Sequence, residues 1–169
     1  MRRRHDCRSA RLWSWSSVVL VAMFAAFIWI EAASAAMVPL TVKQLADKSD
    51  HIVRGEVTAI HSWWDSAHDY IFTTATIRVT EAYKGTLTTQ SEASIVVPGG
   101  VVGGTGFGVE HAPRFASGEE VIVFLTPIED GQFRVTGWEQ GKYSIKNGSV
   151  VERQISVDIF KAQIRAVLK

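Results

Sequence analysis

Cysteine is almost absent from this chain of 169 residues, which contains a single one, Cys7. Cys7 precedes the main hydrophobic run, inside a segment that we expect to be removed on export. The remaining chain then has no thiol, which excludes disulfide bonds, thiol catalysis and cysteine-bound zinc. Proline is scarce as well, with 4 residues, while hydrophobic residues make up 47% of the chain. This composition excludes a disordered or collagen-like chain.

An excess of charge of either sign is also missing, because the formal net charge is +1. Five arginines and two acidic residues lie within positions 1–35. Residues 36–169 therefore carry 13 basic and 15 acidic residues, a net charge of −2. Proteins that bind nucleic acids normally present a basic surface. We therefore expect no nucleic-acid partner.

The first 35 residues have the three parts of a secretory signal peptide. Arginines come first, an uninterrupted apolar run follows from Val18 to Ile30, and Ala33-Ser34-Ala35 matches the pattern of a signal peptidase site. The apolar run is too short to cross a hydrocarbon core of about 30 Å as a helix. We expect cleavage before Ala36, export to the periplasm or the cell exterior, and no membrane attachment afterwards. A retained single-span anchor is the alternative.

Residues 36–169 predict a single, mainly β domain with a helix near each end. Thr41 and Gln44 form a capping-box pattern that predicts a short helix over 42–48. Ser156 can cap an amphipathic C-terminal helix. The apolar stripe of that helix is expected to contain Ile159, Phe160, Ile164, Val167 and Leu168. Alternating or β-branched segments predict strands over 53–59, 70–83, 93–97, 121–125, 132–138, 143–145 and 149–151.

Several of these strands carry more specific predictions. Residues 121–125 are apolar on both faces, which indicates a central strand covered on both sides. Asn147-Gly148 is typical of a type I′ hairpin turn. In the first strand, Val53, Gly55, Val57 and Ala59 are expected to face inward. Continued at the same period, this pattern places Trp63 inward and Trp64 outward.

Short strands with turns at this spacing predict a small barrel of five or more strands. Three motifs also resemble those of a family of small secreted bacterial β-domains. They are SDHIVRGEV at 49–57, Lys84-Gly85 after the second strand, and FASGEEVIVFL at 115–125. The resemblance spans roughly residues 44–168 and implies an OB-like barrel, similar to netrin modules and tissue inhibitors of metalloproteinases. Those inhibitors act through an N-terminal cysteine, which the exported chain lacks, so the resemblance implies a fold and no activity.

The densest polar cluster contains His61, Asp65, His68 and Asp69. Imidazole and carboxylate groups so close in sequence can hold a divalent metal on one loop. The alternative is a solvated hairpin turn between the first two long strands. The spacing matches no established ligand pattern, and we expect no cofactor.

Aromatic residues form the second candidate site. Trp63, Trp64, Tyr70 and Phe107 are the residues that we expect to contact a ligand or partner, because the mouths of barrels commonly bind ligands. The alternative is that such side chains fill the core or close the barrel ends, which we favour for Trp138.

A catalytic arrangement is hard to find in this sequence. His111 has Glu110 beside it and Arg114 three residues later, but no serine lies in a G-x-S-x-G motif. The glycine-rich segment 98–108 lacks a phosphate-binding pattern and predicts a bulged β-connection with positive φ angles. We therefore expect an exported, non-enzymatic module that binds a protein or a glycan. The alternative is an exported hydrolase or metal-dependent enzyme that uses His61, His68 or His111.

Overall fold

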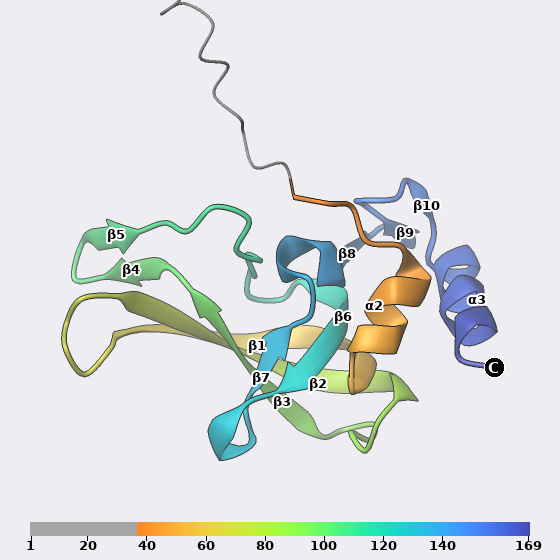
Figure 1. The fold of residues 1–169 in the computed structure, drawn as a ribbon, viewed down its shortest axis with the longest axis horizontal. Coiled ribbons are helices and arrows are strands. Elements are labelled where there is room, and N and C mark those ends of the chain that lie inside the picture. The colour runs from red at the N-terminus through yellow and green to blue at the C-terminus, as the bar shows by residue number, and fades with distance from the viewer. Residues whose placement is uncertain (1–36) are drawn as a thin grey trace, which may run out of the picture. The chain divides into compact units, whose positions relative to one another are not determined.

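The computed structural model describes residues 37–169, so the predicted signal peptide lies outside the described residues. Residues Pro39–Lys169 form one compact unit (Figure 1). Its helices are α2 (Val42–Lys48) and α3 (Val157–Val167), with short 3-10 turns η2 (Glu129–Gly131) and η3 (Trp138–Gly141). Its strands are β1 (His51–Trp64), β2 (Ile71–Lys84), β3 (Glu92–Pro98), β4 (Gly100–Val102), β5 (Thr105–Phe107), β6 (Glu120–Pro127), β7 (Phe133–Val135), β8 (Lys142–Lys146), β9 (Ser149–Val150) and β10 (Ile155–Ser156). Within residues 37–169, neither helix is long and apolar enough to span a membrane.

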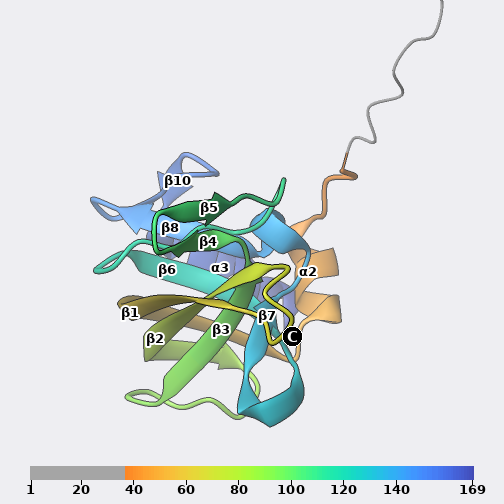
Figure 2. The ribbon, with the colours of Figure 1, turned by 90° about the vertical axis from the view of Figure 1, so that its left-hand side faces the viewer.

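Five of these strands close into a barrel. The order around the ring is β1-β2-β3-β7-β6, and β6 pairs back onto β1 (Figures 1 and 2). The contact between β3 and β7 is parallel, whereas the other neighbours in the ring are antiparallel. Strands β8, β9 and β10 extend the sheet beyond β6. The predicted mainly β barrel with a helix near each end of the domain is confirmed.

Strand β6 lies between two hydrophobic cores. Ile122 and Phe124 pack with the two helices on the outside of the barrel. Val121, Val123 and Leu125 point into the barrel interior. All five side chains are fully buried, which confirms the prediction of a central strand covered on both sides.

The helices begin where the capping residues predict. The Thr41 hydroxyl accepts a hydrogen bond from the Gln44 amide at 3.2 Å, and the Gln44 side chain accepts one from the Thr41 amide at 2.9 Å. At α3 the Ser156 hydroxyl accepts a hydrogen bond from the Ile159 amide at 3.3 Å, without the reciprocal bond. The prediction of the apolar stripe is wrong for one residue, because Ile159 is 54% exposed. It lies about 100° around the helix from buried Phe160, so it points away from the barrel.

Strand β1 contains an extra residue that overturns part of the prediction. Val57 pairs with Ile77 and Ala59 with Thr76, so Thr58 is a one-residue bulge. Such an insertion moves every later side chain to the opposite face of the strand. Ala59, predicted to face inward, is therefore exposed.

The same bulge reverses the two neighbouring tryptophans. Trp64 pairs with buried Ile71 and so lies on the inner face of the β1–β2 ribbon, whereas Trp63 pairs with Phe72 on the outer face. Both tryptophans are half-buried. The expectation of one core tryptophan, Trp63, beside one exposed tryptophan, Trp64, is wrong.

The strands and turns after β6 agree only in part with those predicted from the sequence. Asn147 and Gly148 have φ angles of 52° and 73°, which confirms the β8–β9 turn. The strand predicted over 132–138 covers only Phe133–Val135. It ends early because Gly137 and Trp138 adopt left-handed φ angles of 72° and 59° and start the η3 turn.

Glu81 of β2 connects the barrel to α3. Its carboxylate lies 2.8 Å from Lys161 Nζ and 2.7 Å from an Arg165 nitrogen, both on the helix. Arg54 of β1 lies 3.8 Å away. Partial burial opposes the charge, but the Lys161 hydrogen bond and the charges of Lys161 and Arg165 outweigh it and lower the pKa of Glu81.

We predict that Glu81→Gln lowers the free energy of unfolding by about 1–2 kcal/mol at neutral pH, because it leaves several cations without their common partner. A depressed carboxyl pKa stabilises the fold above the unfolded value of 4.5, and this contribution is lost as the pH falls through the folded value. The difference between the two proteins should therefore shrink on acidification. Urea unfolding at several pH values measures this difference in the free energy of unfolding, and Glu129→Gln, at an exposed position, is the control. A pH-independent difference would contradict the assignment.

Candidate functional site

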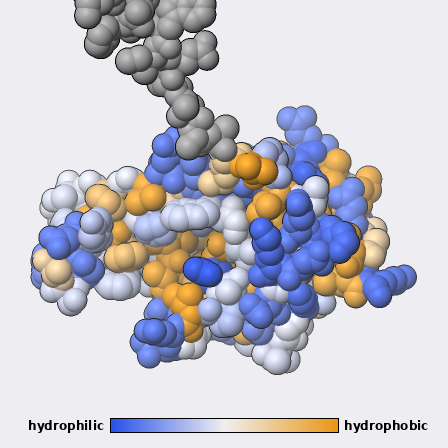
Figure 3. Space-filling model, viewed as in Figure 1, coloured by the Kyte–Doolittle hydropathy of each residue, from blue (hydrophilic) through white to orange (hydrophobic). Residues whose placement is uncertain are grey.

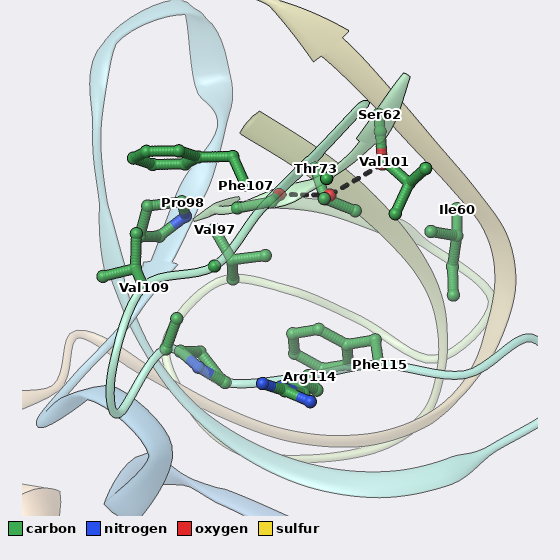
Figure 4. A pocket seen from close by; sticks show the side chains of 16 residues that line it. Ile60, Ser62, Thr73, Val97, Pro98, Val101, Phe107, Val109, Arg114 and Phe115 are labelled. Carbon is green, nitrogen blue, oxygen red and sulfur yellow. Dashed lines mark hydrogen bonds between the residues drawn. The ribbon is translucent and has the colours of Figure 1, made fainter. Parts of the chain in front are cut away.

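A cavity of about 520 Å³, which we call cavity 1, lies beside the β4–β5 hairpin (Figure 4). The far part of the β1–β2 ribbon and the end of β3 form one side. The β4–β5 hairpin and the segment from Gly108 to Phe115 form the other. Most of the wall is apolar, and its larger side chains are Ile60, Val97, Pro98, Val101, Phe107 and Phe115. Figure 3 shows apolar surface in the middle of the face seen in Figure 1, with hydrophilic side chains on either side of it and further apolar side chains at the right-hand edge.

Two hydroxyl groups form the polar part of this wall. Thr73 Oγ1 donates to the carbonyl of Gly99 at 2.6 Å and lies 2.9 Å from Ser62 Oγ. Because the threonine has a single hydroxyl proton, Ser62 must be the donor between the two side chains. Both protons are thus used within the protein, so each hydroxyl can take part in a further hydrogen bond only as an acceptor.

Gly100 lets the hairpin approach these hydroxyls. Its φ is +148°, and a Cβ added there would overlap the Thr73 hydroxyl and lie 2.6 Å from Ser62 Oγ. At the hairpin tip, Gly103 and Gly104 also have positive φ, with open space around them. The prediction of a β-connection with positive φ angles in the glycine-rich segment is confirmed.

The segment from Gly108 to Phe115 is held at His111. The His111 ring nitrogen Nδ1 lies 2.7 Å from Glu139 Oε1, and the Glu139 amide donates to the His111 carbonyl at 3.1 Å. The hydrogen bond to Glu139 raises the pKa of His111, together with the negative charges of Glu139 and Glu110. His111 therefore fixes one wall of cavity 1 to η3.

The structure brings together two of the four predicted contact residues. Tyr70 and Phe107 pack edge to face, with ring centroids 5.6 Å apart, and Phe107 lines cavity 1. Trp64 instead stacks on His68 at 6.0 Å. Trp63 stacks on Phe72 of the outer face and so lies apart from the cavity wall.

The four predicted metal ligands have other surroundings. Asp65 Oδ1 accepts hydrogen bonds from the amides of Asp69 and Tyr70, at 2.8 and 3.0 Å, and so shapes the turn between β1 and β2. His61 is exposed opposite Thr74, while His68 stacks on a tryptophan. Across residues 37–169, no three His, Cys, Asp or Glu side chains are grouped so that they could hold a metal ion.

A second cavity, of about 510 Å³, adjoins the first; we call it cavity 2. The two cavities share Val97, Pro98 and Pro113 as lining residues. Trp138 lines cavity 2 and is 47% exposed, so the core position favoured for it from the sequence is wrong. Its left-handed φ in η3 turns the residue out of the strand that was predicted there.

The sequence did not indicate most residues of these cavities. Ser62 and Thr73 come from two strands whose register the bulge at Thr58 sets, and Arg114 comes from an irregular segment. The usable signals were the aromatic character of Phe107 and the run of glycines, which marked the hairpin but not what it approaches.

No protein-family model matches the chain, and no curated protein matches it either. The resemblance to secreted bacterial β-domains therefore stays a prediction. Function has to follow from the geometry of the site.

We predict that Gly100→Ala lowers the free energy of unfolding by about 3 kcal/mol, because the new methyl group meets the Thr73 and Ser62 hydroxyls and the φ angle is strained. The control is Gly104→Ala, whose φ of +85° is also positive but whose surroundings are open, and which should cost only about 1 kcal/mol. Thermal and urea unfolding measure both. Equal losses would show that the close approach at Gly100 contributes nothing.

Proposed function

We propose that this domain is an exported, non-enzymatic binding module, and that its partner, a protein or a glycan, binds at cavity 1. The observation that carries the proposal is the wall of this cavity. It is mainly apolar, with a few polar groups that converge from different segments, as is typical of ligand sites.

The rim of cavity 1 supports the proposal as well. Tyr70, which packs against the cavity-lining ring of Phe107, is 54% exposed. Val101, which lies in the same β4–β5 hairpin as Phe107, is 65% exposed. Exposed apolar side chains grouped at the edge of a cavity are a feature of interaction sites. In Figure 4 the Phe107 and Phe115 rings lie on opposite sides of the cavity.

The strand order supports an OB-like description of the barrel. The ring β1-β2-β3-β7-β6, closed between β6 and β1 and parallel between β3 and β7, is the arrangement expected for such a barrel. OB-like barrels bind ligands through one face and its loops. Export rests on the signal-peptide pattern of residues 1–35.

The hydrolase alternative has weaker support. His111 and Glu139 form a histidine–carboxylate pair, but the second ring nitrogen of His111 lies 3.6 Å from Glu110 and so faces another acid in place of a nucleophile. The hydroxyl protons of Ser62 and Thr73 are donated within the protein. The residues that line cavity 1 include no histidine or carboxylate that could act as a general base. These contacts favour binding over bond cleavage.

We predict that a photo-crosslinking amino acid at Val101 or Tyr70 captures a partner in the cells that produce the protein. The matched control is Ile159, an apolar residue of α3 with similar exposure at the opposite end of the domain (Figure 1). Adducts are read by gel shift and mass spectrometry. A partner at Val101 and Tyr70 but not at Ile159 supports the proposal. Equal capture at Ile159, or none at either rim position, contradicts it.

A further inference from the structure

Cavity 2 occupies a gap in the barrel wall. Strands β3 and β7 pair at a single position, Ile95 with Phe133. Beyond it, Val96 to Pro98 of β3 lie on one side of cavity 2, and Arg134 and Val135 of β7 lie on the other. The edge of β3 that faces β7 therefore has no strand partner over its last residues. On this edge the carbonyl groups of Val96 and Pro98 point away from β2, whereas the Val97 amide points to β2 and Pro98 has no amide. Carbonyl groups without a partner at such an edge can accept hydrogen bonds from the amides of an additional strand.

The same gap is bordered by cations without partners. Lys48 and Arg134 line cavity 2, and Arg114 lines cavity 1 where the two cavities adjoin. None of the three side chains has a hydrogen-bond or ion-pair partner within residues 37–169. Most other cations of the domain do have one, among them Arg54, Arg78, Lys142, Lys161 and Arg165.

Acidic side chains are missing from the lining of cavities 1 and 2, although Arg114 also borders a smaller third cavity whose lining includes Glu139 and Glu152. This stands out because residues 36–169 contain more acidic than basic residues, 15 against 13. Three exposed cations around acid-free cavities attract anions and repel cationic partners. Guanidinium groups are also well suited to carboxylates, which they bind through two parallel hydrogen bonds.

We propose that the occupant of the joined cavities is an extended acidic segment of a partner protein. It binds as an added strand along Val96–Pro98 of β3, with carboxylates directed to Lys48, Arg134 and Arg114. Its apolar side chains, which alternate with the acidic ones, contact Trp138 in cavity 2 and Phe107 in cavity 1. This inference rests on the proposed function and narrows it from protein or glycan to a peptide of one chemical class.

The alternation follows from strand geometry. Successive side chains of an extended peptide point to opposite sides, so an acidic residue at every second position can reach the cations while its neighbours face apolar wall. Hydrogen bonds from the amides of the peptide to the Val96 and Pro98 carbonyls would supply affinity without regard to sequence, and the cations would supply selectivity.

The test is selection from a random-peptide phage library on the domain, followed by binding measurements on the selected peptides by fluorescence anisotropy. We expect enrichment of Asp and Glu alternating with apolar residues. The triple variant Lys48→Gln, Arg114→Gln, Arg134→Gln should weaken binding of these peptides about tenfold or more, and added salt should weaken binding to the parent domain in the same direction.

The matched control replaces three other cations that have no ion-pair partner within residues 37–169 and lie outside both cavities, Lys146, Arg153 and Lys169, by glutamine. It removes the same net charge and should leave binding unchanged. Equal weakening in both triple variants would overturn the proposal, because only net charge would then matter. Selection of peptides without acidic residues, or tighter binding of polygalacturonate that displaces the peptide, would also overturn it.

Backbone methylation tests the strand pairing. In an added strand, the amides of alternate residues point to the edge that binds it. N-methylation of one alternate set of amides should abolish binding of a selected peptide, and methylation of the other set should not. Equal effects of the two sets would overturn binding as a strand. Failure of the acidic peptides with retained capture at Val101 would overturn this inference and leave the proposed function standing.

Discussion

The double pairing of strand β1 is the constraint on which the rest of the structure depends. Its first half pairs with both β2 and β6 and so closes the barrel, while its second half pairs with β2 alone. A strand can do this only if it bends strongly, and β1 bends through register shifts, including those after Arg54 and at Thr58. Gly55 permits the bend, because a Cβ there would overlap the Arg78 carbonyl and lie 2.5 Å from Ile77 Cγ2.

Both cavities follow from this closure. Beyond the bulge the β1–β2 ribbon leaves the barrel, and Ile60 and Ser62 on its inner face become a wall of cavity 1 instead of core residues. On the other side of the ring, β7 is only three residues long and separates from β3 after one bridging pair, which opens cavity 2. The barrel is thus packed in its centre and open at the place where its shortest strand ends.

The sequence predicts the parts of this fold that depend on local chemistry. Capping at Thr41 and Ser156, the doubly buried run of β6 and the Asn147-Gly148 turn each follow from the side chains within a few residues. Prediction fails where a distant segment decides. Nothing near Thr58 indicates a bulge, so the faces of Trp63 and Trp64 were reversed, and the same residue sets which side chains reach cavity 1.

The candidate site, too, was predictable only where local chemistry decides. Phe107 and Tyr70 were expected from their aromatic character and do meet at the rim. Lys48, Arg114 and Arg134 carry no local signal, because what distinguishes them is that they lie at cavities 1 and 2, whose linings contain no acidic residue. A charge without a partner is a property of the folded surface and cannot be seen in a sequence of near-zero net charge.

The central claim is that the joined cavities form the binding surface, and amide chemical-shift mapping tests it most directly. The isotope-labelled domain is titrated with a selected peptide, and the changes are mapped onto the fold. The account predicts the largest changes in β3, in the segment from Gly106 to Phe115 and between Arg134 and Trp138, with α3 and the β8–β9 hairpin unchanged. Largest changes in α3, or on the outer face of the β1–β2 ribbon around Trp63, would contradict it.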